Sequence, residues 1–405
     1  MEKIKEREHD FISKLRQNAI LARLKDYIQW QRKCDAGAPD QNSPPFSPIS
    51  INLDLTSACN FSCPFCVDSG LINAGKRLTL EEVQKTIDTL QAHGLFSVIL
   101  IGGGEPTLHP DIGKIIRYIK SKNLQIGIAT NGTRLERIEP VMGTLREKDW
   151  VRISIDAGDE ETFKKLHRPR TKVTLTRILE KAKRLKGKNP AVSLGYSFVI
   201  VWEGLEVQRE RLAPNIHEIV QSVQRARDFS FDYISFKPCL IRMEESHRET
   251  LLKDVDRSRE KEIIDEIRSL LEEGKRIAGD EIKILESSNL KAMLNEEVDL
   301  IKRQPKRCHM QFFRTVVSPF GIYHCPAFRG AEEAKIGGPD GYLSRKKLRE
   351  SLQKTGQSIL TFDAAKECKD VGCFYHRTNW WLEGFIQSGR DIHDIEGIED
   401  ENFFF

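Results

Sequence analysis

The sequence predicts an α/β fold, in which six strand–helix units form an open barrel or a doubly wound sheet and a small C-terminal domain with a β-hairpin follows. Two observations predict it. Six short apolar runs alternate with amphipathic helical patterns between residues 49 and 240, and the composition changes after residue 300, where cysteines return. Strands joined by helices are parallel, because parallel pairs need crossover connections. We therefore expect functional residues at the carboxyl ends of the strands.

Residues 1–48 are expected to form a charged helical lead-in that ends in a linker, since residues 35–48 are rich in proline, glycine and serine. The first helix after it is the clearest. Thr79 and Glu82 have the spacing of a capping box, an apolar face follows, and Gly94 can end the helix. The strands are expected at residues 49–55, 97–101, 125–129, 150–155, 192–201 and 232–236.

The last two predicted segments follow this barrel, which is expected to span residues 49–240. Residues 241–300 are expected to be a charged helical connector, because apolar residues recur on one face around Ile263 and Ile267. Residues 301–405 are expected to form the small C-terminal domain. Its hairpin should pair residues 314–317 with residues 322–325 across a Ser-Pro-Phe-Gly turn.

Composition disfavours membranes and nucleic acids as partners. The 405-residue chain has a formal net charge of only +4 and no apolar run of about 18 residues. Its charged N-terminus has no apolar signal core, so we expect a cytoplasmic protein. Residues 164–188 carry eleven Lys or Arg and one acidic residue. This stretch is interpreted as a solvated basic helix face, with phosphate attraction as the alternative.

The first of two cysteine sets, Cys59, Cys63 and Cys66, directly follows the first predicted strand. Three thiolates on one loop can hold three corners of a cubane cluster and leave one iron open. A zinc loop completed by a distant fourth ligand is the alternative, because structural zinc is normally held by four ligands.

Cys59-x3-Cys63-Pro-Phe65-Cys66 resembles the signature of the radical S-adenosylmethionine (SAM) family. The resemblance implies a partial (β/α)6 barrel over residues 49–240 and a [4Fe–4S] cluster that binds SAM through its open iron. It also implies that reducing the cluster cleaves SAM to a 5′-deoxyadenosyl radical, which requires a low-potential electron donor such as flavodoxin or ferredoxin. Phe65 is then expected near the adenine.

Further strand-end residues resemble the SAM-binding positions of the same family. Gly102, Gly103 and Gly104 precede Glu105 and a proline after the second strand, and glycines there let backbone approach a ligand closely. The resemblance implies that Glu105 meets the methionyl ammonium. Asn131 and Ser154, at the ends of strands three and four, resemble positions that contact the ribose and carboxylate. Either could instead belong to an ordinary cap or turn.

The second set comprises Cys308, Cys325, Cys368 and Cys373, two beside the hairpin and two on one loop. Four cysteines fit a closed site for zinc or for a second [4Fe–4S] cluster. The segment from Ser318 to Pro326 resembles the hairpin of SPASM and twitch domains, which implies one auxiliary cluster.

The leading hypothesis is a radical SAM oxidoreductase that abstracts hydrogen from a small polar substrate and passes the second electron to the auxiliary cluster, as in the twitch-type alcohol dehydrogenases that it resembles. Cys239 follows the sixth strand and could instead donate hydrogen in an epimerase, although a lone cysteine is more often a packed residue. A peptide-modifying maturase and a zinc-stabilised binding protein are further alternatives.

Overall fold

The structure is a computed structural model that describes residues 10–37, 44–242, 249–252 and 257–405. Parts of three predicted segments lie outside the described residues: the charged start at 1–9, the linker at 38–43, and the connector at 243–248 and 253–256. None of the described helices is both long enough and apolar enough to cross a membrane.

A ten-stranded sheet runs through the molecule in the order β11-β8-β5-β4-β3-β2-β1-β12-β13-β14. The six predicted barrel strands are consecutive neighbours in this sheet, and all of them pair in parallel. The α/β prediction is therefore confirmed. These strands are β1 (Ser50–Leu53), β2 (Ser97–Leu100), β3 (Gln125–Thr130), β4 (Trp150–Ser154), β5 (Ser193–Ile200) and β8 (Tyr233–Pro238).

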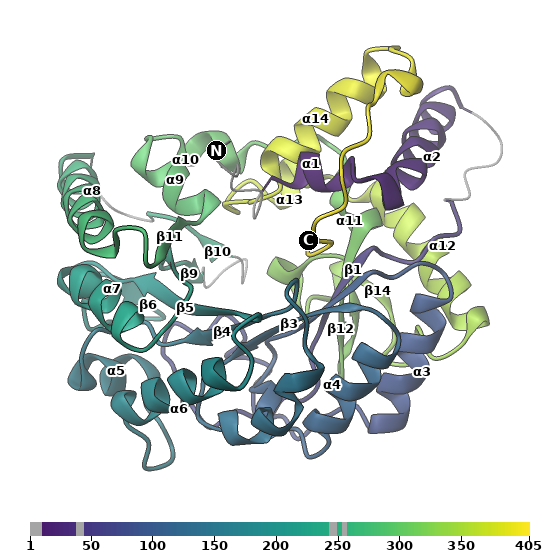
Figure 1. Ribbon diagram of the computed structural model, residues 1–405. Helices are drawn as coiled ribbons and strands as arrows, with labels where there is room; N and C mark the ends of the chain where they lie inside the picture. The colour runs from purple at the N-terminus through teal and green to yellow at the C-terminus, as the bar shows by residue number, and fades with distance from the viewer. Residues whose placement is uncertain (1–9, 38–43, 243–248, 253–256) are drawn as a thin grey trace.

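Helices cover the outer face of the sheet because each presents an apolar stripe to it (Figure 1). The predicted capping box is present: the Thr79 hydroxyl accepts a hydrogen bond from the backbone N–H of Glu82, whose carboxylate accepts one from the Thr79 N–H. The positive φ of Gly94, 95°, lies in the turn after this helix. The helices along this face are α3 (Leu80–Gln91), α4 (Ile112–Ser121), α5 (Glu160–His167), α6 (Leu175–Lys188), α7 (Ile219–Asp228) and α8 (Arg257–Ala278).

Part of the segment predicted as a helical connector is a strand. β11 (Lys283–Glu286) pairs in parallel with β8 and forms one edge of the sheet. Charged residues at both ends of a four-residue strand leave too short a pattern to reveal it. The helices α9 (Ser288–Leu294) and α10 (Val298–Lys302) follow it, as expected for a helical segment.

The predicted hairpin exists, but it extends the main sheet rather than standing apart from it. β12 (Arg314–Ser318) pairs in parallel with β1 and antiparallel with β13 (Gly321–Tyr323), which in turn pairs with β14 (Lys335–Gly337). The second strand thus ends two residues before the predicted limit at residue 325. β12 is buried along its whole length, which a strand with neighbours on both sides requires.

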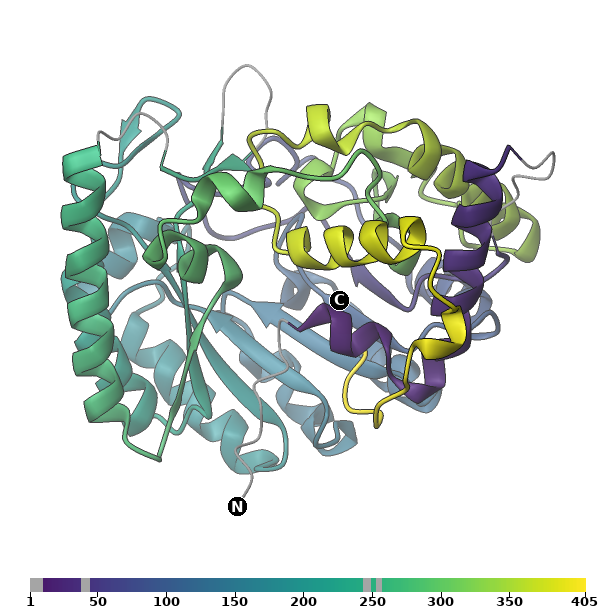
Figure 2. The ribbon, with the colours of Figure 1, turned by 90° about the horizontal axis from the view of Figure 1, so that it is seen from above.

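Helices from the two ends of the chain pack together. α1 (Phe11–Leu15) and α2 (Asn18–Asp35) lie against α14 (His376–Gln387), and they share a second apolar core (Figure 2). The remaining elements are α11 (Met310–Phe313), α12 (Arg345–Thr361), α13 (Ala364–Glu367), β6 (Glu206–Val207), β7 (Glu210–Arg211), β9 (Ile241–Arg242) and β10 (Glu249–Thr250).

Candidate functional site

Cys59, Cys63 and Cys66 lie on the loop that follows β1. Burial raises the pKa of the Cys63 thiol well above its usual value, and the neighbouring Cys66 and Cys59 thiols raise it further. Burial is also the main reason that the pKa of Cys66 is raised to about 12. These thiols favour the protonated form only while no cation is near, and binding to iron reverses that preference.

The glycine loop after β2 packs directly on this cysteine loop. The Gly103 N–H donates to Asp68 Oδ2 at 3.0 Å, and the Glu105 N–H donates to the Ala58 carbonyl at 2.8 Å. A Cβ on Gly104 would lie 2.4 Å from the Thr56 carbonyl oxygen, so only glycine fits there. Gly102 and Gly103 have φ of 46° and 69°, which other residues rarely adopt.

The Glu105 carboxylate joins the β2 and β3 loops. It is 2% exposed and accepts hydrogen bonds from Thr107 N and Oγ1 at 2.9 and 2.5 Å, from Thr130 Oγ1 at 2.6 Å and from Asn131 N at 2.7 Å. Burial raises its pKa, and these donors oppose that shift. Both oxygens are thus engaged with the protein, an arrangement that the motif did not predict.

Asn131 fixes the cysteine loop to the end of β3. Its Nδ2 donates to Asn60 Oδ1 at 2.8 Å, and its Oδ1 accepts from both donors of Thr133. Ser154 ends β4 and is half-buried, and Phe65 is half-buried with its ring 6.1 Å from that of His167. The predicted SAM-contact residues therefore lie on four neighbouring strand ends, at one edge of the sheet.

His167, the last residue of α5, packs against the cysteine loop. It is 2% exposed; its Nε2 donates to the Ile155 carbonyl at 2.7 Å and lies 3.5 Å from Asp156. Its Nδ1 is 3.2 Å from Cys63 Sγ. The missed signal was the spacing of His167 with Phe163 and Leu166 on α5, since all three lie on the buried face of that helix.

A buried ion cluster connects the cysteine loop to the C-terminal segment. Arg329 Nε is 2.7 Å from Asp54 Oδ2, and its Nη1 is 2.8 Å from Asp68 Oδ1. A Cβ on Gly102 would lie 3.0 Å from Arg329 Nη2. The sequence did not reveal this cluster because Arg329 is 261 residues from Asp68. Asp54 at a strand end and Asp68 two residues after Cys66 were the available signals.

Comparison with known families agrees with this geometry. Residues 53–205 match the family model described as the Radical SAM superfamily, and they contain the cysteine loop and all four strand ends. This segment is thus similar to radical SAM domains. The fold that the sequence signature implied is thereby confirmed for these residues.

Curated relatives match less than half of the chain. The chain is 33% identical over 197 residues to molybdenum cofactor biosynthesis protein moc-5 of Caenorhabditis elegans, covering 46% of this chain and 30% of that protein. It is 28% identical over 188 residues to a probable GTP 3′,8-cyclase of Pyrococcus horikoshii, covering 43% and 55%. It is 35% identical over 121 residues to mycofactocin maturase MftC of Mycobacterium ulcerans, covering 28% and 31%. The chain thus spans between 30% and 55% of the length of these relatives.

Solved structures resemble a larger part of the chain. The structure of anSMEcpe with bound AdoMet has a TM-score of 0.54 at 16% identity, covering 86% of this chain and 98% of that one. Streptococcus suis SuiB bound to S-adenosylmethionine has a TM-score of 0.52 at 16% identity, covering 71% and 63%. At such low identity these matches concern the fold alone.

The second cysteine set lines one mostly enclosed cavity beside the segment that matches the radical SAM model. Cys308, Cys325, Cys368 and Cys373 line this cavity, whose volume is about 30 Å³. Burial raises the pKa of Cys308 to about 12, and the Asn379 amide lies 3.9 Å from its sulfur. Among the described residues, no three His, Cys, Asp or Glu side chains converge to hold a single ion. A [4Fe–4S] cluster does not require such convergence, because each thiolate binds a different iron.

Cys239 directly follows β8 and packs into the main apolar core. It is 1% exposed, and burial raises its pKa far above the usual value for a thiol. Within the described residues, the one polar contact of its side chain is 3.7 Å, from the sulfur to the Leu240 carbonyl, and its backbone N–H donates to the Ile200 carbonyl. This environment is typical of an inert packed cysteine.

The basic stretch at residues 164–188 makes many contacts within the chain. Lys181 donates to the Thr133 carbonyl and pairs with Glu136 at 2.8 Å, and Lys186 pairs with Asp232 at 2.7 Å. These contacts favour the interpretation as a solvated helix face.

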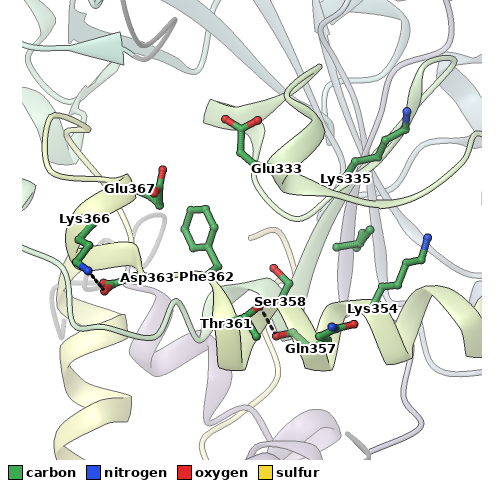
Figure 3. A pocket seen from close by; sticks show the side chains of 11 residues that line it. Glu333, Lys335, Lys354, Gln357, Ser358, Thr361, Phe362, Asp363, Lys366 and Glu367 are labelled. Carbon is green, nitrogen blue, oxygen red and sulfur yellow. Dashed lines mark hydrogen bonds and ion pairs between the residues drawn. The ribbon is translucent and has the colours of Figure 1, made fainter.

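An open groove lies between α12 and the segment around β14 (Figure 3), and it adjoins the second cysteine set, because Phe362 lines both the groove and the cysteine cavity. Lys366 pairs with Asp363 across its end, and Phe362 points into it. None of the predicted site residues is among the described residues that line it.

Proposed function

We propose that this chain is a radical SAM oxidoreductase with an auxiliary [4Fe–4S] cluster, acting on a C–H bond of a small polar substrate. One observation carries the proposal. The molecule contains two separate sets of cysteines. Three lie on a strand-end loop of the segment that matches the radical SAM model, and four line a neighbouring cavity. A three-cysteine cluster with an open iron supplies reductive SAM cleavage, and a four-cysteine cluster supplies an electron acceptor.

In this proposal the chain's own residues have distinct roles. Cys59, Cys63 and Cys66 hold the SAM-binding cluster, and Cys308, Cys325, Cys368 and Cys373 hold the auxiliary one. Residues 102–105 contact the methionyl group of SAM, and Phe65, Asn131 and Ser154 contact the rest of the SAM molecule. Since Glu105 accepts hydrogen bonds from the β2 and β3 loops, it also fixes the shape of that contact surface. A low-potential donor such as flavodoxin or ferredoxin supplies the first electron.

The test is metal content and SAM cleavage after anaerobic reconstitution of the full chain. We expect about eight irons in the wild type and about four after joint replacement of Cys59, Cys63 and Cys66 by alanine. That variant should form no 5′-deoxyadenosine. Joint Cys308→Ala and Cys325→Ala replacement should also remove about four irons but retain SAM cleavage. Cys34→Ala, outside both sets, is the control. Zinc in the second site would contradict the auxiliary cluster.

A radical epimerase that uses Cys239 as hydrogen donor is the alternative that starts with the same abstraction. The burial of Cys239 argues against it. Once a substrate is found, product mass in deuterated water separates the two. Loss of two hydrogens in both wild type and Cys239→Ser is the expected result. Gain of one solvent deuterium without oxidation, abolished by Cys239→Ser, would establish epimerisation instead.

A peptide-modifying maturase is the second alternative, favoured by the similarity over 121 residues to mycofactocin maturase MftC. Anaerobic incubation with candidate metabolites and, separately, with candidate peptides distinguishes the classes. The substrate class is the one that increases 5′-deoxyadenosine formation above the uncoupled rate.

A further inference from the structure

The cavity that the second cysteine set surrounds contains polar groups that have no hydrogen-bond partner among the described residues. Arg314, the first residue of β12, lines it and is 5% exposed. Within the described part of the chain, its Nε and Nη1 atoms have no hydrogen-bond partner. His324, 4% exposed and next to Cys325, likewise has two ring nitrogens without a partner among the described residues.

A buried guanidinium without a counter-charge is expensive, because desolvation is not repaid. Arg314 instead lies near two aromatic rings, 6.0 Å from Phe374 and 5.7 Å from Tyr375. None of the described side chains that line the cavity is a carboxylate. Asp54 lies outside this lining and interacts electrostatically with Arg314, but it is already paired with Arg329 at 2.7 Å. The cysteine thiolates and what they hold supply the further negative charge that the guanidinium needs.

A cluster ligated by four thiolates provides that charge. The [4Fe–4S] core with four thiolates carries a net charge of −2 when oxidised and −3 after it accepts one electron, and its sulfurs accept hydrogen bonds. A fixed neighbouring cation stabilises the more negative state more strongly. Arg314 is thus placed to favour the reduced form.

We propose that Arg314 is a positioning residue that raises the reduction potential of the auxiliary cluster by directing its unpartnered guanidinium N–H groups and its charge at the cluster sulfurs. This inference rests on the proposed function, since it needs a cluster in the cavity. It explains how the site could accept one electron from a substrate radical, with the cluster reduced and the substrate oxidised.

The test is the reduction potential of the auxiliary cluster, measured by redox titration followed by electron paramagnetic resonance. The full chain with Cys59, Cys63 and Cys66 replaced by alanine is used, so that only the second cluster contributes. In this background Arg314→Gln should lower the reduced-to-oxidised ratio at a fixed potential at least tenfold. For a one-electron couple that is a downward shift of about 59 mV. Arg314→Lys, which keeps the charge, should shift it much less.

Arg307→Gln is the matched control. Arg307 is next to Cys308, but its charge is already paired with Asp35 at 2.5 Å, and it is not among the residues that line the cavity. Arg307→Gln should leave the reduced-to-oxidised ratio at a fixed potential within twofold of the value in the background protein. An equal shift in Arg307→Gln and Arg314→Gln, or none in Arg314→Gln, overturns the inference.

Three further outcomes separate this inference from the proposed function. If the background protein binds no iron, the auxiliary cluster itself is wrong. If Arg314→Gln loses iron while Arg314→Lys keeps it at an unchanged potential, the positive charge is required for the cluster, and the inference is supported. If both variants lose iron, Arg314 acts through its shape, and the inference is overturned.

Discussion

At the residue scale, Glu105 combines a charge with a structural link. Its carboxylate receives four hydrogen bonds from three residues on two loops, while it is almost fully buried. The charge is tolerated in this position because each oxygen has donors. A neutral side chain of the same size would not satisfy them all, so the acidic residue of the motif is needed even before SAM binds.

We therefore expect Glu105→Gln to destabilise the fold. The amide NH2 group would face a donor, and hydrogen bonds to charged groups contribute about 1.5–3 kcal/mol each. Urea unfolding of the protein without iron should show a loss of about that size, together with weaker SAM binding after reconstitution. Glu82→Gln is the control, because glutamine also serves in a capping box. An unchanged unfolding free energy would mean that the four bonds do not form in solution.

Gly104 offers a second residue-scale prediction. A methyl group there would meet the backbone of the cysteine loop, 2.4 Å from the Thr56 carbonyl oxygen, and backbone cannot move aside cheaply. Gly104→Ala should lower the unfolding free energy by about 1–3 kcal/mol and reduce iron at the first site. Gly143→Ala has open space around the new atom and should do neither. Full iron content in Gly104→Ala would show that the two loops can separate without harm.

The cysteines and glycines of the site could be predicted from the sequence because a motif places them within a few residues of one another. His167, Arg314 and Arg329 could not, since their roles depend on which distant segments the fold brings near them. His167 is the most instructive case. Its helical spacing already indicated burial, but only the packing of α5 shows that it meets Cys63.

At the element scale, the alternating pattern predicted the six parallel strands well, since each is buried between helices and its neighbours. It could not predict how the hairpin pairs. β12 and β13 read as a local antiparallel pair, and the parallel partner of β12 is β1, more than 260 residues earlier. β11 was missed because edge strands are short and half-exposed.

Arg329 joins these elements chemically. It follows the Cys325 segment and pairs with Asp54 after β1 and with Asp68 in the cysteine loop. Arg329→Met would leave two buried carboxylates without their cation. Because breaking a buried ion pair on one side typically costs about 3–5 kcal/mol, we expect a loss of that size in chemical unfolding. Arg329→Lys should lose less, although it cannot contact both carboxylates with the same fork of N–H groups.

The same variants report on the link between the two sites. If Arg329 holds the cysteine loop in place, Arg329→Met should lower iron at the first site while the second keeps its iron. Arg329→Met is therefore added to two backgrounds that each keep one cluster. The iron signal of the second site is measured with Cys59, Cys63 and Cys66 replaced by alanine. The iron signal of the first site is measured with Cys308 and Cys325 replaced by alanine. Equal loss at both sites would indicate general unfolding rather than a local link.

At the scale of the whole molecule, residues 403–404 pack against the edge of the sheet opposite to the cysteine loop. The Phe403 carbonyl accepts a hydrogen bond from Ser97 Oγ at 2.6 Å, and its N–H donates to the Gln125 side chain at 2.8 Å. The Phe404 ring lies 5.6 Å from that of Trp150. Ser97, Gln125 and Trp150 begin β2, β3 and β4, so these contacts lie at the amino ends of the strands.

Because the contacts of residues 403–404 lie at the amino ends of the strands, a change there should affect stability without affecting SAM binding. Phe404 is 8% exposed, and replacing a buried phenylalanine by alanine typically costs about 3–5 kcal/mol. Phe404→Ala should therefore lower the free energy of unfolding by about that amount, whereas Leu300→Ala, at a side chain 48% exposed, should lower it much less. SAM affinity of the folded, reconstituted Phe404→Ala protein should stay near the wild-type value, because the proposed SAM site lies at the carboxyl ends of the same strands. If Phe404→Ala also weakens SAM binding under conditions in which the protein stays folded, the amino and carboxyl ends of the strands are energetically coupled.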